Sequence, residues 1–450
     1  MTDNSDKTAE PVSAAALSSG AGSRRGIAFR PYWWEAAPPD PAVDALPARA
    51  EVVVIGAGFT GLSAARTLLR HGSGVVVLDA ETPGFGASTR NGGQVGSGNQ
   101  KFRVRRLVEI HGREKAIALL REGVRMLDYT AALIAEDGID CHFTRCGRFR
   151  GAVRPAHYDS MARDLEDLQA AVGVAFFMVP RAGQHNEISS DRFHGGSVLP
   201  NDASLHPGLY HDGLLAGVRA RGGVVAGKAR ATAILREKDG FVVVTPRGRI
   251  SARHVIVTTN GYRSGAVPYL DRRIVPVGSA QIVTGELPDG LLRRLMPSGR
   301  VYGNTNRVFS YFRGVPGSAR IMWGGRVGRL APAESVAAFA HLARDLLHTF
   351  PDLAGIPITH AWTGQIGYTY DELPHLGVAD GIHYAMGYCG TGVSRSTYFG
   401  HKIALRLVGD PDGGTAFDDI PFRSHPFHFA APVAVPLYET WYRFRDATNL

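Results

Sequence analysis

Hydrophobic and polar positions between residues 51 and 79 follow the order of a buried strand, a short turn, a helix and a second buried strand. Residues 52–55 form an apolar, β-branched run, and residues 75–78 form another. A glycine-rich turn follows the first run, and Phe59–Arg70 has the length and spacing of a helix. The pattern therefore predicts a strand–helix–strand unit with parallel strands.

Periodic hydrophobic segments continue along most of the chain. From 273 to 326 the segments alternate and are rich in aromatic residues, which is typical of an antiparallel sheet with one solvated face. The fold class predicted from this order is α/β, and α+β for the chain as a whole. Helices are expected over 104–136, 155–172, 207–221, 332–350 and from about 392 to 407, and strands over 224–226, 231–236, 241–245, 249–258, 280–284, 308–313, 319–325 and 382–386.

The first turn carries the chemistry of a dinucleotide site. Gly56 permits a tight turn, Gly58 leaves room for a pyrophosphate, and Gly61 lets the helix pack close to the strand. The helix would direct its amino-terminal dipole at the phosphates. Asp79 closes the second strand, where a carboxylate accepts hydrogen bonds from a ribose and repels a 2′-phosphate, so FAD or NAD is favoured over NADP. A glycine triplet alone is weak evidence in a chain with 55 glycines, but the complete unit is specific.

Two further glycine-rich segments accompany this unit. The loop 84–96 suits close approach of backbone to a ligand, and the turn 387–392 precedes the last predicted helix. No second complete glycine-turn unit with its acid follows. A flavoenzyme that also binds NAD(P)H in a domain of its own would need one.

Composition limits the class of protein without identifying it. At 450 residues the chain is long enough for two or three domains or one large interleaved pair, and 44% hydrophobic and 20% charged residues are ordinary for a globular protein. The net charge of +9 is spread along the sequence rather than clustered, so nucleic acid is not an expected partner. The sequence contains no run of about 20 apolar residues, which is the length that a membrane-spanning helix needs, so no span is expected. Residues 1–30 are expected to be a disordered tail without an export signal.

The cysteines argue against a structural metal and against disulfides. The sequence has three, and Cys141 and Cys146 lack a second pair of ligands at zinc spacing. A reduced, cytoplasmic protein without metal is expected.

Several motifs together resemble one family of flavoenzymes. They match the FAD-dependent amine and amino-acid oxidoreductases of the D-amino-acid oxidase superfamily, in particular the γ-glutamylputrescine oxidase-like branch. The resemblance runs from about Tyr32 to Asp410. The segments that carry it are Tyr32-Trp33-Trp34, Ala87 to Gln94, Thr259 to Tyr262, Tyr311-Phe312-Arg313, Gly324-Gly325-Arg326, Trp362-Thr363-Gly364 and Asp371 to Pro374.

The resemblance implies a glutathione-reductase-like FAD-binding domain interleaved with an antiparallel-sheet substrate domain. The FAD-binding domain would comprise 31–100, 200–265 and 362–425, and the substrate domain 101–199 and 266–361, with 426–450 as a carboxy-terminal extension. The turn before the last helix would direct the amides of Gly390, Thr391 and Gly392 at the flavin, where they stabilise negative charge on the reduced ring. Many relatives have histidine where this chain has Thr391.

Flavin contacts can be assigned residue by residue from the resemblance. Covalent attachment is not expected, because Gly364 stands where sarcosine oxidases have the attached cysteine, and no histidine occurs between 81 and 100. The expected non-covalent FAD contacts are Gly56, Gly58, Phe59, Thr60, Gly61, Asp79, Ala80, Ala87, Ser88, Arg90, Asn91, Gly92, Gly93, Gln94, Ala231, Thr259, Asn260, Gly261, Gly364, Gly387, Gly390, Thr391, Gly392 and Val393.

The implied reaction is hydride transfer from the carbon next to a neutral amine to flavin N5. The resulting imine hydrolyses to an aldehyde or oxo acid, and O2 or another acceptor reoxidises the flavin. No side-chain base is obligatory, so no catalytic residue is assigned. Arginines that bind a carboxylate and aromatic residues that orient the substrate are expected instead. The candidates for substrate contact are Arg90, Tyr311, Arg313, Trp362 and Arg395, each of which also has an ordinary structural interpretation.

Two other functions stay open at this point. One branch of the superfamily modifies tRNA, although this chain shows neither a clustered basic face nor an added methyltransferase domain. A non-catalytic FAD-binding subunit of a larger oxidase is the second. The sequence does not indicate the oligomeric state, the substrate, or whether the enzyme is an oxidase or a dehydrogenase.

Overall fold

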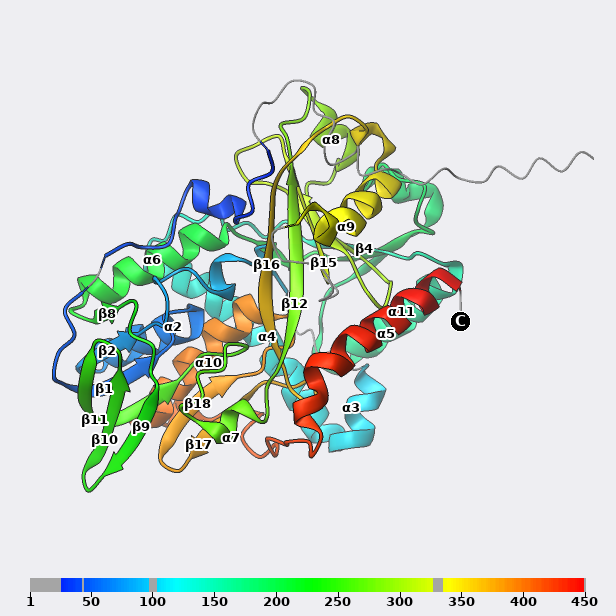
Figure 1. The fold of residues 1–450 in the computed structure, drawn as a ribbon. Coiled ribbons are helices and arrows are strands. Elements are labelled where there is room, and N and C mark those ends of the chain that lie inside the picture. The colour runs from blue at the N-terminus through cyan, green and yellow to red at the C-terminus, as the bar shows by residue number, and fades with distance from the viewer. Residues whose placement is uncertain (1–25, 43, 97–102, 327–334, 449–450) are drawn as a thin grey trace, which may run out of the picture.

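The computed structural model describes residues 26–42, 44–96, 103–326 and 335–448. Two eight-stranded sheets dominate it (Figure 1). The first, at the lower left of Figure 1, contains the predicted strand–helix–strand unit, and the second lies at the upper right with α8 and α9. The long strands β12 and β16 of the second sheet run side by side through the centre of the molecule.

The first sheet is mainly parallel. Its strand order is β17-β18-β11-β1-β2-β8, and β10 pairs antiparallel with both β11 and β9. Its central strands are continuous apolar runs, because other elements cover both faces of this sheet. Its strands are β1 (Arg49–Ile55), β2 (Val75–Leu78), β8 (Val224–Ala226), β9 (Ala233–Glu237), β10 (Gly240–Thr245), β11 (Gly248–Val257), β17 (His375–Ala379) and β18 (Ile382–Met386).

The second sheet has the order β16-β12-β15-β14-β13-β4-β6-β5. It is antiparallel as predicted, except that β13 and β4 pair in parallel. The boundary predicted after residue 361 falls within β16, which belongs to this sheet. Its strands are β4 (Arg148–Gly151), β5 (Phe177–Val179), β6 (Gly196–Leu199), β12 (Val275–Thr284), β13 (Val301–Asn304), β14 (Tyr311–Gly314), β15 (Ile321–Arg326) and β16 (Ile358–Tyr368). A small third sheet pairs β3 (Gln94–Val95) with β7 (Ala203–Ser204).

The helices cover the outer faces of the sheets. The predicted helix 104–136 is two helices, because Gly112 between them adopts a φ of 79°. The α-helices are α2 (Phe59–Arg70), α3 (Val104–His111), α4 (Arg113–Glu136), α5 (Pro155–Val172), α6 (Pro207–Ala220), α7 (Pro268–Asp271), α8 (Leu291–Leu295), α9 (Val336–Thr349), α10 (Gly392–Leu407) and α11 (Ala431–Thr448). The 3-10 helices are η1 (Tyr32–Glu35), η2 (Ala87–Thr89), η3 (Arg181–Asn186), η4 (Pro351–Leu353), η5 (Pro411–Gly413) and η6 (His428–Ala430).

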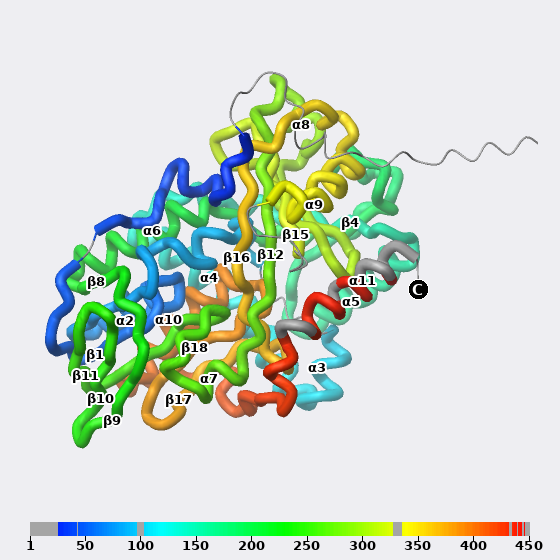
Figure 2. Tube along the Cα trace, in the orientation of Figure 1, coloured from blue at the N-terminus to red at the C-terminus, as the bar shows by residue number. Residues whose placement is uncertain are grey.

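The amino-terminal segment differs in part from the expected tail. Residues 1–25 lie outside the described part of the chain, but 26–30 are ordered against the second sheet. Ala28 forms an isolated bridge with His360 on β16, and Ile27 and Phe29 pack on the core of that sheet. Figure 2 shows this first described segment in blue beside β16. Burial of these apolar side chains stabilises residues 26–30 against the sheet. The composition of the residues before them had suggested that disorder continues to residue 30.

Each sheet has its own core. Strands of the first sheet pack on α2, α6 and α10 through Val54, Leu62 and Phe399, among others. One face of the second sheet is covered by α9, whose Phe339 and Leu342 pack on Trp323. No described helix is long and apolar enough to cross a membrane.

A close contact joins α2 to α10, although the two helices are more than 300 residues apart. A Cβ atom at Gly400 would lie 2.2 Å from the backbone oxygen of Thr60, so only glycine fits there. Ser63 Oγ donates to the Thr397 carbonyl at 2.6 Å, and the hydroxyls of Thr60 and Tyr388 are 2.8 Å apart. The two helices are therefore held at backbone distance.

A buried ion pair fixes the other end of α2. Arg66 and Asp137 have side chains only 5% and 4% exposed, and Arg66 Nη2 donates to Asp137 Oδ1 at 2.9 Å. Burial raises the pKa of Asp137, but the hydrogen bond and charge of Arg66 outweigh it, and the pKa falls below its ordinary value. Arg221 also donates to Asp137 at 2.8 Å.

Replacement Gly400→Ala is expected to destabilise the protein by about 1–3 kcal/mol, because the new methyl group meets a backbone oxygen that cannot rotate away. The gain in helix propensity of about 1 kcal/mol does not offset this clash. Urea unfolding measures the change. Gly217→Ala on α6 is the matched control, since its Cβ would meet mainly the mobile Arg221 guanidinium at 3.1 Å, and it should be neutral or stabilising. Equal effects of the two substitutions would contradict the close contact.

Replacement Asp137→Asn is expected to cost about 3–5 kcal/mol at neutral pH, because it removes the buried carboxylate that Arg66 pairs with and leaves only the half-exposed carboxylate of Glu136. The folded-state pKa of Asp137 is depressed, so its contribution is present above the unfolded pKa of about 3.9 and disappears as pH falls through the folded value. Urea unfolding at pH 7 and at stepwise lower pH should show the wild-type advantage shrinking in acid. Glu136→Gln, whose carboxylate is 50% exposed, should change stability by less than about 1 kcal/mol.

Candidate functional site

One large cavity lies where the first sheet, α10 and the second sheet meet. Its volume is about 1270 Å³, above the roughly 300–1,000 Å³ of an ordinary small-molecule site. The turn after β1, the loop after β2, the turn before α10 and one face of the second sheet all contribute to its lining. The cavity has room for a nucleotide cofactor and a substrate together.

The first glycine turn forms one end of the cavity. Gly56 has a φ of 110°, which favours glycine, and a Cβ atom at Gly61 would lie 1.8 Å from the Gly56 oxygen. The turn is therefore as tight as the sequence predicts. Phe59 N, in the first turn of α2, donates to Ser88 Oγ at 2.9 Å, so the loop after β2 is attached to the start of this helix.

Asp79 lies at the end of β2 and lines the cavity. Its two carboxylate oxygens accept backbone N–H groups from Ala57 at 2.8 Å and Glu81 at 2.9 Å. Burial nevertheless raises its pKa. These bonds orient the carboxylate and leave acceptor capacity on each oxygen for a ribose hydroxyl.

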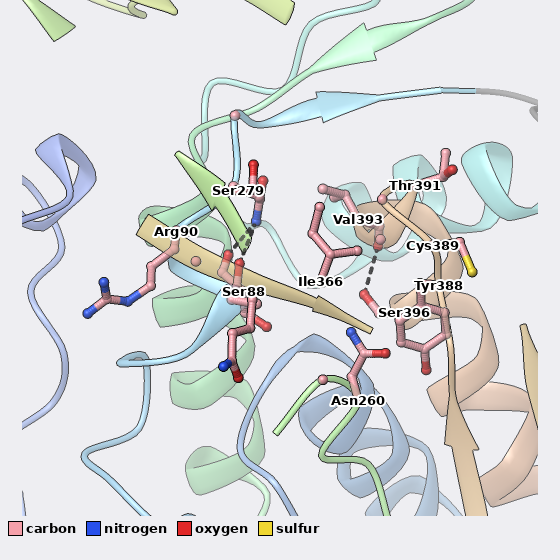
Figure 3. A pocket seen from close by; sticks show the side chains of 18 of the residues that line it. Ser88, Arg90, Asn260, Ser279, Ile366, Tyr388, Cys389, Thr391, Val393 and Ser396 are labelled. Atoms are coloured by element: carbon pink, nitrogen blue, oxygen red, sulfur yellow. Dashed lines mark hydrogen bonds between the residues drawn. The ribbon is translucent and has the colours of Figure 1, made fainter. Parts of the chain in front are cut away.

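The second glycine turn also lines the cavity. Figure 3 shows Tyr388, Cys389, Thr391 and Val393 on one side of Ile366, with Ser88 and Arg90 on the other. The Thr391 amide donates to the Tyr388 carbonyl at 3.0 Å, so it is not available to a flavin as predicted. The predicted role falls to the amides of Gly390 and Gly392. A Cβ at Gly392 would meet no atom within 4 Å, which leaves open space for a ligand.

Most of the predicted cofactor contacts meet in this cavity. Those that line it are Gly56, Gly58, Phe59, Thr60, Asp79, Ala80, Ala87, Ser88, Arg90, Asn91, Gly92, Gln94, Ala231, Thr259, Asn260, Gly261, Gly364, Gly390, Thr391, Gly392 and Val393.

Three predicted contacts lie behind the cavity wall instead. Gly61, Gly93 and Gly387 do not line the cavity. Added Cβ atoms there would lie 1.8 Å from the Gly56 oxygen, 2.1 Å from the Leu205 oxygen and 2.4 Å from a methyl group of Thr369, respectively. These glycines allow close packing behind the cavity surface, and their contact with the cofactor stays a prediction.

Of the predicted substrate contacts, Tyr311 and Arg90 line the cavity. The Tyr311 hydroxyl lies 3.1 Å from Ser279 Oγ, and burial raises its pKa to about 12. Arg90 donates to the carbonyls of Phe85 at 2.7 Å and Thr363 at 3.0 Å, and its guanidinium extends away from the other labelled side chains in Figure 3. Its hydrogen bonds therefore serve the loop rather than a substrate.

Arg313, Trp362 and Arg395 do not line the cavity. Arg313 is buried, and its Nη1 donates to the carbonyls of Gly93 at 3.0 Å and Leu205 at 2.9 Å. Arg395 donates to the Tyr388 carbonyl at 3.3 Å from a buried position. Trp362 is 2% exposed and donates to the Arg90 carbonyl at 3.0 Å. All three support the wall of the cavity in this structure, and their contact with a substrate stays a prediction.

The second sheet supplies cavity residues that the sequence analysis did not single out. On β12, polar Ser279 and Gln281 line the cavity, whereas Ala280 and Ile282 face the core on the other side. The alternation of polar and apolar residues along β12 is present in the sequence and indicates which face of the strand is polar. Further lining residues include Arg148, Arg150, His157, Asn304, Arg326 and Tyr368.

These observations fit FAD and give no indication of a metal. Two glycine turns in one cavity, an oriented carboxylate at the end of β2, and open space at Gly392 match the parts of a dinucleotide. Within the described part of the chain, no group of three or more His, Cys, Asp or Glu side chains is placed to hold a metal ion.

Comparison with known proteins agrees with this geometry. The chain is 30% identical over 414 residues to γ-glutamylputrescine oxidoreductase of Escherichia coli, an alignment that covers 88% of this chain and 92% of that protein. It is also 30% identical over 396 residues to a probable oxidoreductase, OrdL, of Rhizobium meliloti, covering 84% and 88% of the two chains.

Solved structures share the fold at lower identity. Glycine oxidase of Geobacillus kaustophilus superposes with a TM-score of 0.68 at 20% identity, covering 84% of this chain and 99% of the other. The fructosyl amine:oxygen oxidoreductase Amadoriase I of Aspergillus fumigatus superposes with a TM-score of 0.67 at 18% identity, covering 87% and 93%.

The family assignment rests on most of the chain. Residues 51–406, from the start of β1 nearly to the end of α10, match the family described as FAD dependent oxidoreductase. The cofactor is accordingly FAD, which this family binds typically without a covalent bond. The chain belongs to the D-amino-acid oxidase family of FAD-dependent oxidoreductases, enzymes that act on the carbon–nitrogen bonds of amines and amino acids.

Proposed function

We propose that this enzyme oxidises the carbon next to a neutral amine. The carbon loses a hydride and the nitrogen a proton, and the resulting imine takes up water to give a carbonyl compound and the released amine. When bound, FAD supplies the two-electron acceptor for this step and is reoxidised by O2 or another acceptor.

The observation that carries the proposal is the continuity of the cavity. It extends from the two glycine turns, which fit FAD, onto the polar face of the second sheet at Ser279 and Tyr311. A substrate on that face would be enclosed beside the cofactor, as close approach of the reacting atoms requires. The E. coli relative is by name an oxidoreductase of an amine, which supports the same class of substrate.

The chain's own residues would bind and orient rather than exchange protons. Burial keeps the pKa of Tyr311 near 12, so its hydroxyl stays protonated at neutral pH and donates or accepts hydrogen bonds only as a neutral group. His211, which also lines the cavity, lies with Nε2 2.7 Å from the Ala57 carbonyl, and burial lowers its pKa. Hydride transfer from an amine that is already neutral needs no side-chain base at these positions.

We propose further that residues of the two turns hold FAD, with Gly390 and Gly392 facing the ring and Asp79 facing the ribose. A cytoplasmic location and dissociable FAD fit this proposal. Modification of tRNA has no specific support, because the arginines of the cavity wall are engaged by carboxylates and carbonyls such as those of Asp202 and Phe85 rather than gathered on an open face.

Replacement Gly392→Val is expected to weaken FAD binding at least tenfold, because its side chain would occupy the open space before α10. FAD retained per chain after gel filtration, and titration of the apoprotein with FAD, measure the effect. The backbone of Gly392 is not in the left-handed region, so the apoprotein should fold, which far-UV circular dichroism checks. Gly414→Val, at an exposed glycine outside the cavity, should retain FAD fully. Full FAD retention by Gly392→Val would remove that turn from the cofactor site.

Anaerobic mixing with a suitable amine is expected to bleach the visible absorbance of the bound flavin within one turnover. Polyamines, N-methyl amino acids and D-amino acids form the panel, and admission of air then distinguishes an oxidase, whose colour returns rapidly, from a dehydrogenase. Bleaching would exclude a non-catalytic subunit. Failure of the whole panel, with dithionite still reducing the flavin, would count against amine oxidation.

A further inference from the structure

The last helix carries an apolar stripe on its outer side. Ala434, Leu437, Tyr438 and Trp441 have the i, i+3, i+4, i+7 spacing of one helix face, and all four are exposed. The three large side chains are 66%, 63% and 54% exposed, respectively. Figure 1 shows α11 in red across the front of the molecule. Because a surface helix normally turns such a stripe toward its own core, this outward stripe indicates a contact beyond the single chain.

The segment that carries the stripe is attached to the rest of the chain on its other side. Nε2 of His428 accepts from Arg263 Nη1 at 3.2 Å, because a guanidinium only donates. Its Nδ1 therefore carries the hydrogen and donates to the Tyr370 hydroxyl at 2.7 Å. On α11, burial raises the pKa of Tyr442, and the charge of Arg307, which lines the cavity, partly offsets this rise. These contacts set the direction in which the stripe faces.

The stripe is part of a larger apolar surface. Phe427 and Phe429, in the turn before α11, are 65% and 77% exposed, and their rings lie 6.1 Å apart. A large aromatic side chain has about 150–250 Å² of surface, so these two and the three large residues of the stripe expose on the order of 600 Å² together. Two copies would bury about 1,200 Å² in this way, which reaches the size of a specific protein–protein interface.

Charge favours a second copy of the chain over a lipid surface as the partner. Helices that lie on membranes are rich in lysine and arginine on their polar face. The sequence 431–448 contains two acidic residues, two arginines and no lysine, so its net charge is zero. A two-fold contact places identical surfaces against each other, and an uncharged apolar stripe meets its own copy without like-charge repulsion.

The order of residues in the stripe suits an antiparallel pair of helices. With a two-fold axis between positions 437 and 438, Leu437 of one copy would meet Tyr438 of the other, and Trp441 would meet Ala434. The largest side chain of the stripe is thereby placed against the smallest. Interdigitation of this kind is what close packing between two helices requires.

We propose that the protein forms a two-fold symmetric dimer in which the apolar stripe of α11, together with Phe427 and Phe429, packs on the same surface of a second copy. The helix lies beyond residues 51–406, which match the family, so membership of the family does not account for this surface. The proposal is independent of the reaction that the enzyme catalyses.

Sedimentation of the full-length holoenzyme tests the proposal. At micromolar concentration the wild-type protein should have twice the 48.3 kDa mass of the chain. Trp441→Glu should raise the dissociation constant of the dimer at least 100-fold, because it buries an unpaired charge at the interface. Leu235→Glu is the matched control, since it adds the same charge at a 47% exposed apolar position on β9, and it should remain dimeric. All three proteins should retain FAD.

Cysteine cross-linking tests the arrangement of the two helices. Leu437→Cys places a thiol next to the proposed axis and should give at least tenfold more disulfide-linked dimer under mild oxidation than Thr440→Cys. Thr440 is exposed on the same helix but lies outside the stripe. Wild-type protein is the background, because Cys141 and Cys389 are buried and Cys146 is partly buried. Equal cross-linking at positions 437 and 440 would refute the stripe as the contact.

Two other results would overturn the proposal. One is a wild-type protein that is monomeric at micromolar concentration, and the other is a Trp441→Glu dimer as stable as that of the wild type. Flotation with vesicles of phosphatidylcholine and phosphatidylglycerol provides the remaining test. Binding by the monomeric wild-type protein that Trp441→Glu abolishes would assign the surface to a membrane instead of a second copy.

Discussion

The contact between α2 and α10 is the constraint on which the site depends. A methyl group at Gly400 would overlap the Thr60 backbone, and one at Gly61 would overlap Gly56, so the strand, turn and two helices are packed at backbone distance. This packing brings the turn at 56–61 and the turn at 387–392 to one cavity. Hydrogen bonds between Ser63 and Thr397 and between Thr60 and Tyr388 then set the helices in register. A cofactor held between the two turns links the amino-terminal and carboxy-terminal parts of the chain.

The need of buried arginines for hydrogen-bond acceptors is a second constraint on the cavity wall. A guanidinium inside the protein must find acceptors, and backbone carbonyls at chain turns are the nearest ones. Arg313 takes the carbonyls of Gly93 and Leu205, and Arg90 takes those of Phe85 and Thr363. These side chains fasten the loop after β2 to the second sheet. Their charges are thereby neutralised by hydrogen bonds within the wall.

Local pattern predicted much of the fold, and long-range pairing explains where it failed. β8, β18 and α10 begin and end as expected, because apolar runs, a turn and a glycine lie next to one another in sequence. The break at Gly112 depends on a single backbone angle, and the parallel pairing of β13 with β4 joins residues about 150 positions apart. The place of Arg150 in the cavity wall could not be predicted from its neighbours in sequence, because it depends on the pairing of Arg150 with Gly303 and of Gly303 with Tyr311 across strands.

The two sheets contribute different kinds of wall to the cavity, one made mainly of backbone and one made of side chains. At the first sheet the wall consists of backbone. An added Cβ atom at several of its glycines would lie within 3 Å of other main-chain or side-chain atoms, so these positions tolerate little change. At the second sheet the wall is made of side chains that alternate with a separate core, so Ser279, Tyr311 or Arg150 can differ without disturbing Ala280, Phe312 or Phe149 behind them. A strand offers this freedom because its two faces are independent. We therefore expect packing to constrain the part of the wall proposed to bind FAD, and the choice of substrate to depend on side chains that the packing leaves free.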